Sequence, residues 1–291
     1  MPTLQNFKFI RPENLDQACR ILSENRGKVK ILAGGTDVMI EMRDDKLPPS
    51  IEMVMEISHL EELRFIEDDG KNIRIGAATT HAEVAESELI RKNAPLLAEA
   101  AATVGSPQIR NRGTVAGNSI TASPAADTIP PLLVLDATVV LRRGTEKREV
   151  PLRDIFTGPN QTNIGNDELV TEIYFEKLPD DTRTAFIKLA RRNSAAKSRM
   201  NFAARARQND AGEVIELRIS AGSVTPSPSR FNAAENILLG KIPSESLLKE
   251  AGEAVSGDMI RQSGYRWSTD YKKPVVESLT VRVLEEVLTI Y

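Results

Sequence analysis

The order of strand-like and helix-like segments constrains the fold of this chain more than any other feature of its sequence. Residues 14–25 show helical periodicity, with Asn14 as a candidate N-cap before an apolar face. A doubly wound sheet needs a crossover helix after each parallel strand, and the segments do not alternate in that way. We therefore predict the α+β class. The expected strands are 29–33, 51–57, 63–67, 72–77, 137–144, 147–150 and 168–178, and further helices are expected at 38–43, 80–87 and 95–104.

A polar segment at residues 177–184, which contains Pro179, is the best candidate for a domain boundary. The strand-like runs that follow it predict an antiparallel meander, and they span 185–192, 202–208 and 214–224. The final helix carries an apolar stripe that we expect to be core, made of Val276, Leu279, Val283, Leu284, Val287 and Leu288. We therefore expect a first domain of residues 1–178 and a second of residues 183–291.

Composition and charge exclude several classes of protein. The formal net charge is −3, so the chain lacks the basic excess that is typical of nucleic-acid-binding proteins. It has no run of about 18 apolar residues, so we expect no integral membrane segment. Its start, MPTLQNFKFI, holds no apolar signal core, and we expect a cytoplasmic protein.

Cysteine and histidine are too few to build a metal centre. Cys19 is the single cysteine, which excludes intrachain disulfides and clusters held by cysteines of this chain. It falls on the apolar side of the first helix, where we expect a buried thiol. His59 and His81 lack a ligand pattern, and we expect them in turns or facing solvent. No metal ligand and no catalytic acid or base is therefore assigned.

A glycine pair lies between a strand-like run and a helix-forming run, in the sequence AGGTD at residues 33–37. Successive backbone amides in such a turn can form a concavity that binds anionic oxygens. A plain strand-to-helix turn is the alternative. In that case Gly35 provides an unusual backbone angle and Asp37 caps the following helix.

A second segment, residues 105–127, consists mostly of small and polar residues, and we expect it to be a long irregular loop. Long irregular segments inside compact domains usually have a function. Two small-residue loops could together clamp a cofactor rich in phosphate. The spacing fits neither a P-loop nor G-x-G-x-x-G, which favours a dinucleotide held by a different fold.

Four motifs together resemble the flavin-binding subunit of molybdenum hydroxylases, the family of xanthine, nicotinate and carbon monoxide dehydrogenases. They are AGGTD (33–37), GSPQIRN (105–111), TVAGN (114–118) and SPAAD (123–127). The resemblance continues through IGAATTH (75–81), TGPNQT (157–162), DELVTEI (167–173) and SVTPSPSRFNAAENILLG (223–240). It implies a two-lobed FAD-binding domain of the vanillyl-alcohol-oxidase (PCMH) type, followed by a small domain with an antiparallel sheet and helices.

The resemblance also implies roles for individual residues. Two stretches would hold the FAD diphosphate: Ile31, Leu32, Ala33, Gly34, Gly35, Thr36, Asp37 and Val38 in the first, and Thr114, Val115, Ala116, Gly117 and Asn118 in the second. Asp127 would bind the adenosine portion, and Ile120 would pack against the isoalloxazine ring. Val104, Val170 and Lys188 would be further contacts, and the segment Arg191 to Lys197 would lie near the other face of the ring. Without the resemblance, Asp127 reads as an N-cap and Lys188 as a solvated strand residue.

Ala116 departs from the family pattern, which usually has glycine at this position. If the position needs a positive φ, alanine costs about 1 kcal/mol or more and loosens the loop. If it needs only a small side chain, alanine is nearly neutral, and the intact remainder of the motif favours this second interpretation.

The family implies a division of labour between chains. A large molybdopterin-binding subunit hydroxylates the substrate, a small [2Fe-2S] subunit passes the electrons on, and the FAD of this chain delivers them to NAD or another acceptor. A dimer of heterotrimers is the expected assembly. A stand-alone FAD-dependent oxidoreductase of the same fold and a non-catalytic assembly protein remain alternatives.

Overall fold

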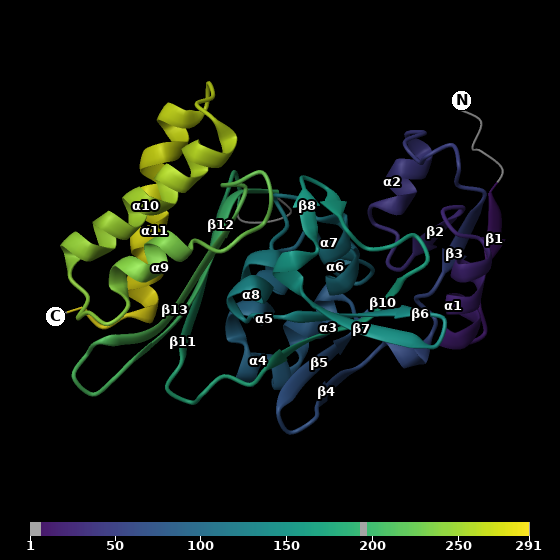
Figure 1. Cartoon of the computed structure of the whole chain (residues 1–291), viewed down its shortest axis with the longest axis horizontal. Coiled ribbons are helices and arrows are strands. Elements are labelled where there is room, and N and C mark those ends of the chain that lie inside the picture. The colour runs from purple at the N-terminus through teal and green to yellow at the C-terminus, as the bar shows by residue number, and fades with distance from the viewer. Residues whose placement is uncertain (1–6, 193–196, 291) are drawn as a thin grey trace.

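The computed structural model describes residues 7–192 and 197–290, which form three regions along the long axis of the molecule. Figure 1 shows an N-terminal lobe, a middle lobe and a C-terminal domain in that order from right to left. The expected boundary at 178–183 falls between β10, which ends at Glu176, and β11, which begins at Arg183. The division into two domains at that point stays a prediction.

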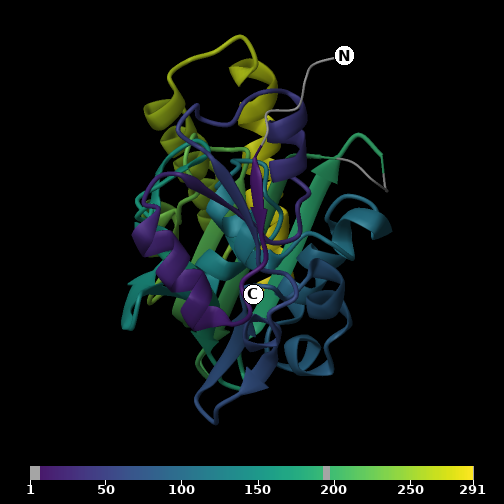
Figure 2. The ribbon, with the colours of Figure 1, turned by 90° about the vertical axis from the view of Figure 1, so that its right-hand side faces the viewer.

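The N-terminal lobe is a small parallel sheet with helices beside it, and it lies toward the viewer in Figure 2. Its elements are β1 (Lys8–Ile10), α1 (Leu15–Glu24), β2 (Val29–Leu32), α2 (Val38–Arg43) and β3 (Met53–Glu56), and the strand order is β1-β3-β2. Asn14 caps α1 as predicted, because its side chain accepts a hydrogen bond from the amide of Gln17 at 2.9 Å. Cys19 is fully buried on α1, which confirms the expected burial of its thiol.

The middle lobe contains an antiparallel sheet of order β4-β5-β10-β6-β7. Its strands are β4 (Ile66–Asp68), β5 (Asn72–Gly76), β6 (Thr138–Arg143), β7 (Glu146–Pro151) and β10 (Leu169–Glu176), with the short pair β8 (Phe156–Gly158) and β9 (Gln161–Thr162) beside it. Both predicted hairpins are confirmed, since β4 pairs with β5 and β6 with β7. The helices are α3 (His81–Glu86), α4 (Glu88–Asn93), α5 (Pro95–Thr103), α6 (Pro107–Arg110), α7 (Val115–Thr121) and α8 (Ile129–Val134), with 3₁₀ turns at Glu61–Leu63 and Leu152–Asp154.

The segment 105–127 is not the irregular loop that its composition indicates, because it forms α6 and α7. Each helix has a side-chain N-cap: Ser106 accepts from the amide of Ile109 at 3.4 Å, and Thr114 accepts from the amide of Gly117 at 3.0 Å. Val115, Ala116 and Ser119 of α7 are buried rather than solvated. Close packing of the helix therefore explains the composition that we interpreted as loop.

The C-terminal domain places three helices on one face of an antiparallel sheet of order β11-β12-β13. The strands are β11 (Arg183–Ala190), β12 (Ser198–Gln208) and β13 (Val214–Gly222), and the helices are α9 (Asn232–Leu238), α10 (Glu245–Ser263) and α11 (Thr269–Val287). The predicted meander is confirmed. The whole apolar stripe predicted in the last helix is buried against the sheet.

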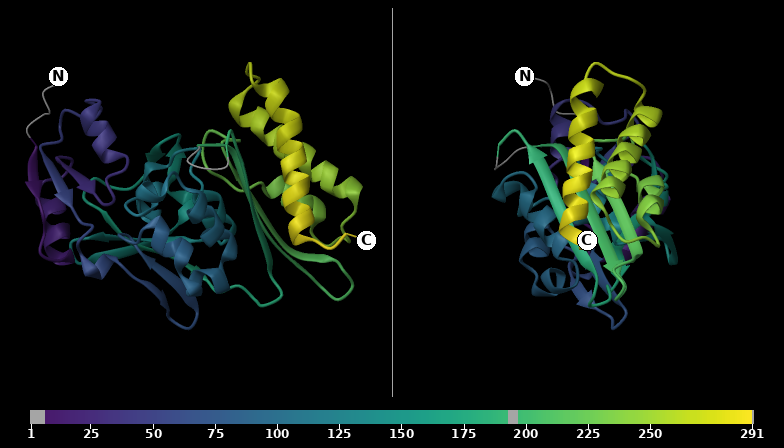
Figure 3. Two further views of the ribbon diagram at one scale, coloured as in Figure 1. Left: turned by 180° about the vertical axis from the view of Figure 1, so that it is seen from behind. Right: turned by 90° about the vertical axis from the view of Figure 1, so that its left-hand side faces the viewer.

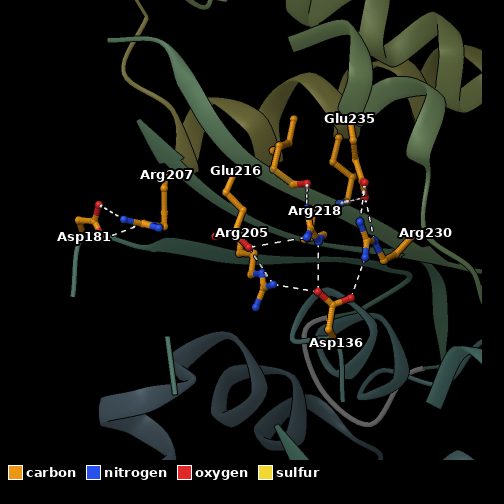
Figure 4. Close-up of polar contacts among 10 residues, drawn as sticks. Asp136, Asp181, Arg205, Arg207, Glu216, Arg218, Arg230 and Glu235 are labelled. Carbon is orange, nitrogen blue, oxygen red and sulfur yellow. Dashed lines mark hydrogen bonds and ion pairs between the residues drawn. The ribbon is translucent and has the colours of Figure 1, made fainter. Parts of the chain in front are cut away.

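Asp136, at the turn that follows α8, connects the middle lobe to the C-terminal domain (Figure 4). It has a positive φ of 52° and accepts hydrogen bonds from three arginines of the other domain. Arg205, Arg218 and Arg230 donate to it at 2.9, 3.2 and 2.6 Å. One carboxylate therefore holds three cations from two strands and a loop against the middle lobe.

Candidate functional site

The two glycine segments touch through their backbones. A Cβ added to Gly34 would lie 1.9 Å from the carbonyl oxygen of Arg112 and 2.8 Å from the Cα of Gly113, so only glycine fits there. The contact continues at Asp37, whose carboxylate accepts a hydrogen bond from the Thr121 hydroxyl at 3.1 Å, 84 residues further along the chain. The sequence predicted two loops on one ligand, and the structure brings these two segments together.

A third segment, residues 79–81, fixes the position of the second one. The amide of His81 donates to the carbonyl of Gly113 at 2.9 Å, and the amide of Val115 donates to the carbonyl of Thr79 at 3.2 Å. Thr80 and Glu83 form a capping box at the start of α3, which anchors this segment to the middle lobe. The start of α7 is therefore held from both sides, by the AGGTD turn and by α3.

Four successive amides of the AGGTD turn are available as donors. Among the described residues, none accepts a hydrogen bond from the amides of Gly34, Gly35, Thr36 or Asp37. Gly35 has a φ of +77°, so the turn uses the left-handed conformation that glycine permits. Asp37 occupies the N-cap position of α2 but makes no side-chain cap hydrogen bond, so of the plain-turn alternative the unusual angle at Gly35 is present and the side-chain cap is not. Consecutive free amides of this kind can bind an anionic oxygen.

Ala116 adopts helical backbone as the second residue of α7 and is 3% exposed. It is not among the residues with positive φ, so the interpretation that requires only a small side chain is confirmed.

Among the other residues assigned to the cofactor, Val115 and Val170 lie in the core of the middle lobe, whereas Ile120 on α7 is 40% exposed. Val104 is the C-cap residue that follows α5, and the Asn118 side chain accepts a hydrogen bond from the Thr128 hydroxyl. The side chains assigned to the cofactor therefore divide between the core and the surface.

Asp127 is the centre of a buried polar network between the middle lobe and the C-terminal domain. Its Oδ2 accepts from the Lys188 ammonium at 2.7 Å, and its Oδ1 accepts from Asn201 at 2.9 Å and from the Ser198 hydroxyl. Lys188 also donates to the carbonyl of Thr103 at 2.8 Å, so it is not a solvated strand residue. Asp127 is not the N-cap of α8 either, because Thr128 lies at that position.

His81 is buried, not in a turn or facing solvent as we expected. It is 2% exposed, and its Nδ1 has no hydrogen-bond partner among the described residues. Burial, with a smaller contribution from the nearby charge of Arg110, lowers the pKa of His81 to about 4, so the imidazole is neutral at pH 7. His59 does lie in a turn, where its Nδ1 is hydrogen-bonded to the Glu56 carboxylate and its Nε2 to the carbonyl oxygen of Pro12.

Sequence reasoning missed three residues of this region: His81, Ser198 and Asn201. IGAATTH contains His81, but nothing in the motif indicates its burial. Ser198 and Asn201 lie in a strand that was predicted only from its apolar run, and their partner Asp127 is more than seventy residues away. Residues 193–196 of the expected Arg191 to Lys197 segment lie outside the described residues.

Residues 7–192 and 197–290 contain no candidate metal site and no membrane-spanning helix. In these ranges no group of three or more His, Cys, Asp or Glu side chains could hold a metal ion. Within the same ranges, no helix is both long enough and apolar enough to cross a membrane.

Two family models match this chain, one on each side of the expected boundary. The family model "FAD binding domain in molybdopterin dehydrogenase" matches residues 5–177, and the "CO dehydrogenase flavoprotein C-terminal domain" matches residues 185–287. The chain therefore belongs to the family of FAD-binding subunits of molybdenum hydroxylases, and it is an oxidoreductase subunit.

Full-length relatives agree with this assignment. The chain is 31% identical to the nicotinate dehydrogenase FAD-subunit of Eubacterium barkeri, over 98% of this chain and 97% of the relative. It is also 31% identical to the xanthine dehydrogenase FAD-binding subunit of Escherichia coli O157:H7, over 96% and 94% of the two chains. A carbon monoxide dehydrogenase structure from Hydrogenophaga pseudoflava superposes with a TM-score of 0.90 at 27% identity and covers 98% of each chain.

Proposed function

We propose that this chain is the flavin end of a molybdenum hydroxylase complex. It would receive electrons from an iron–sulfur partner and deliver them through FAD to NAD or another acceptor. The observation that carries the proposal is the row of four amides at Gly34–Asp37 that have no acceptor in the described part of the chain, in backbone contact with the segment before α7. Such a donor set fits a diphosphate, because each amide can meet an anionic oxygen without a lysine or arginine in the loop.

The remaining residues would each contact a different part of FAD. The start of α7, residues 114–118, would close the second side of the diphosphate, and Asp127 would accept a hydroxyl of the adenosine ribose. Lys188 neutralises the Asp127 carboxylate, which limits its repulsion of the nearby phosphates. The exposed Ile120 side chain would pack against the isoalloxazine ring. FAD supplies the redox chemistry when bound, and the protein binds and orients it.

The proposal requires partners, because the described residues contain no candidate metal cluster. A large molybdopterin-binding subunit and a small [2Fe-2S] subunit would supply the missing centres. Relatives named as a medium chain or an FAD-subunit, such as the medium chain of glyceraldehyde dehydrogenase from Sulfolobus acidocaldarius, support this arrangement. A dimer of heterotrimers, NAD as acceptor and a cytoplasmic location are further parts of the proposal.

The test is the redox behaviour of the purified chain. We expect a flavin absorption spectrum and electron transfer from NADH to an artificial dye, because both need only a bound and accessible flavin. We expect no hydroxylation of heterocycles, aldehydes or carbon monoxide until both partner subunits are added. Oxidation of an organic substrate by the chain alone, at about 1 per second or faster, would show that it is a self-contained oxidase or dehydrogenase.

A variant pair tests the loop contact that carries the proposal. In Gly34→Ala the new Cβ would collide with the carbonyl of Arg112, so the two loops must separate and flavin content should drop. Gly257→Ala is the control, because a Cβ at that position in α10 meets no atom within 4 Å. Both variants are purified and their flavin-to-protein ratios compared by absorbance. Full flavin content in Gly34→Ala would overturn the diphosphate assignment.

A further inference from the structure

Asn201 is a fully buried amide on β12 whose donor and acceptor atoms are all used. Its Nδ2 donates to the carboxylate of Asp127 at 2.9 Å and to the carbonyl of Ala126 at 3.2 Å. Its Oδ1 accepts from the amide of Gly222 at 3.0 Å. We propose that Asn201 is a positioning residue, through which the C-terminal domain orients Asp127 toward the adenosine half of FAD.

The side chain of Asn201 is held from two elements at once. Gly222 on β13 fixes its oxygen, and a Cβ at Gly222 would lie only 2.5 Å from that oxygen. Residues 126 and 127 of the middle lobe fix its nitrogen. Because the amide cannot rotate without breaking a buried hydrogen bond, it determines where the Asp127 carboxylate points.

The carboxylate of Asp127 keeps room for one more donor. An ionised carboxylate offers about four acceptor positions, and donors from the described part of the chain take three of them, namely Asn201, Ser198 and Lys188. The remaining position suits a single hydroxyl group, as on a ribose. Three fixed donors leave that position in one direction, so a ligand hydroxyl meets a preorganised acceptor.

This arrangement makes adenosine binding depend on a residue of the other domain. The loops at Gly34 and Thr114 belong to the first 178 residues and would hold the diphosphate without Asn201. The loss of Asn201 should therefore weaken FAD, which carries adenosine, and should leave flavin mononucleotide (FMN), which lacks it, almost unaffected. The inference rests on the proposed function, because it assumes that Asp127 faces adenosine.

The experiment compares the dissociation constants of FAD and FMN on the apo form of the full chain, measured by flavin fluorescence. In Asn201→Ala we expect the FAD constant to rise by about tenfold or more, the effect of losing a hydrogen bond to a charged group. The FMN constant should change by less than about twofold. Asn201→Ser repeats the comparison if the alanine variant does not fold.

Two further variants separate positioning from simple stabilisation. Asp136→Asn weakens the same domain interface without touching Asp127, so it should lower the melting temperature and leave the FMN-to-FAD ratio unchanged. In a double-mutant cycle, adding Asn201→Ala to Asp127→Asn should cause little further loss of FAD affinity, because the residue through which Asn201 acts is already changed.

The outcomes distinguish the two claims. If wild-type chain binds FAD and Asn201→Ala weakens FAD and FMN equally, Asn201 has only a structural role and the inference is wrong. The same holds if Asp136→Asn alters the ratio as much as Asn201→Ala does. If wild-type chain binds neither flavin, the proposed function fails and the inference fails with it.

Discussion

At the scale of single residues, burial changes the chemistry of His81 more than its sequence context indicates. The imidazole lies under the junction of the two loops, with its Nδ1 unpaired among the described residues and its Cδ2 3.4 Å from the position of a Cβ on Gly113. A charged imidazole would be poorly solvated there, so the folded protein keeps it neutral. The stability of the fold is therefore linked to pH through this one side chain.

We predict that His81→Leu removes an acid-dependent loss of stability. The pKa of His81 is lowered from 6.5 to about 4, so between these values the unfolded chain binds a proton that the folded chain does not. Stability is then complete above about pH 6.5 and falls as pH drops toward 4, by about 3 kcal/mol for this group. Urea unfolding of both proteins at about pH 7 and about pH 4.5 measures the difference. Equal pH dependence in the two proteins would contradict it.

At the scale of elements, local patterns predicted the helices α1, α2, α3, α5 and α11 and both hairpins, because caps, periodicity and turns lie within a few residues of one another. The parallel pairing of β1, β3 and β2 was not predicted, because nothing local specifies which distant strands pair. Helix α7 was missed for another reason. Its sequence, VAGNSIT, has no apolar stripe, and its stability comes from the Thr114 cap and from contact with neighbouring segments.

The candidate site was likewise predictable only where its residues lie in local motifs. The two glycine segments and Asp127 were found through family motifs, and their geometry agrees with a shared location for the loops. The partners of Asp127 were not found, because Ser198 and Asn201 carry no motif and reach it only through domain packing.

For α7 we predict that Ala116→Gly, which restores the family's usual residue, lowers stability and leaves flavin content unchanged. Ala116 is helical and buried, so glycine adds backbone entropy to the unfolded state and removes a packed methyl group. The expected loss is about 1 kcal/mol in the free energy of unfolding, measured by urea titration. A gain in stability or a higher flavin affinity would mean that alanine strains the loop.

At the scale of the whole molecule, two polar contacts hold the domains together on the same strand, β12. One is the network of Asp127 with Ser198 and Asn201, and the other is the junction of Asp136 with Arg205. Around Asp136, Glu216 pairs with Arg205 and Glu235 with Arg230, as Figure 4 shows. The positive charge of three arginines is thus distributed over three carboxylates, of which only Asp136 belongs to the middle lobe.

We predict that Asp136→Asn destabilises the chain by about 1–3 kcal/mol, because three converging arginines lose their shared anion. The expected loss is modest because the side chain of Asp136 is 34% exposed and solvent screens its charge. Thermal unfolding at low and high salt measures the loss, which should shrink as salt screens the repulsion. Arg207→Gln is the matched control, because its partner Asp181 lies in the boundary segment just before β11 and the pair is more exposed, so the melting temperature should hardly move. Equal shifts in the two variants would contradict a special role for Asp136.

The position of β10 determines when this protein can fold during synthesis. It lies between β5 and β6 in the sheet, although it leaves the ribosome after both hairpins. Its first residue, Leu169, completes the core of the N-terminal lobe, and the next, Val170, belongs to the core of the middle lobe. Until these residues emerge, each hairpin exposes an unpaired edge and neither lobe has its full core. Both lobes of the flavin domain therefore close in one late step, and a nascent chain that stalls before β10 exposes two edges for aggregation.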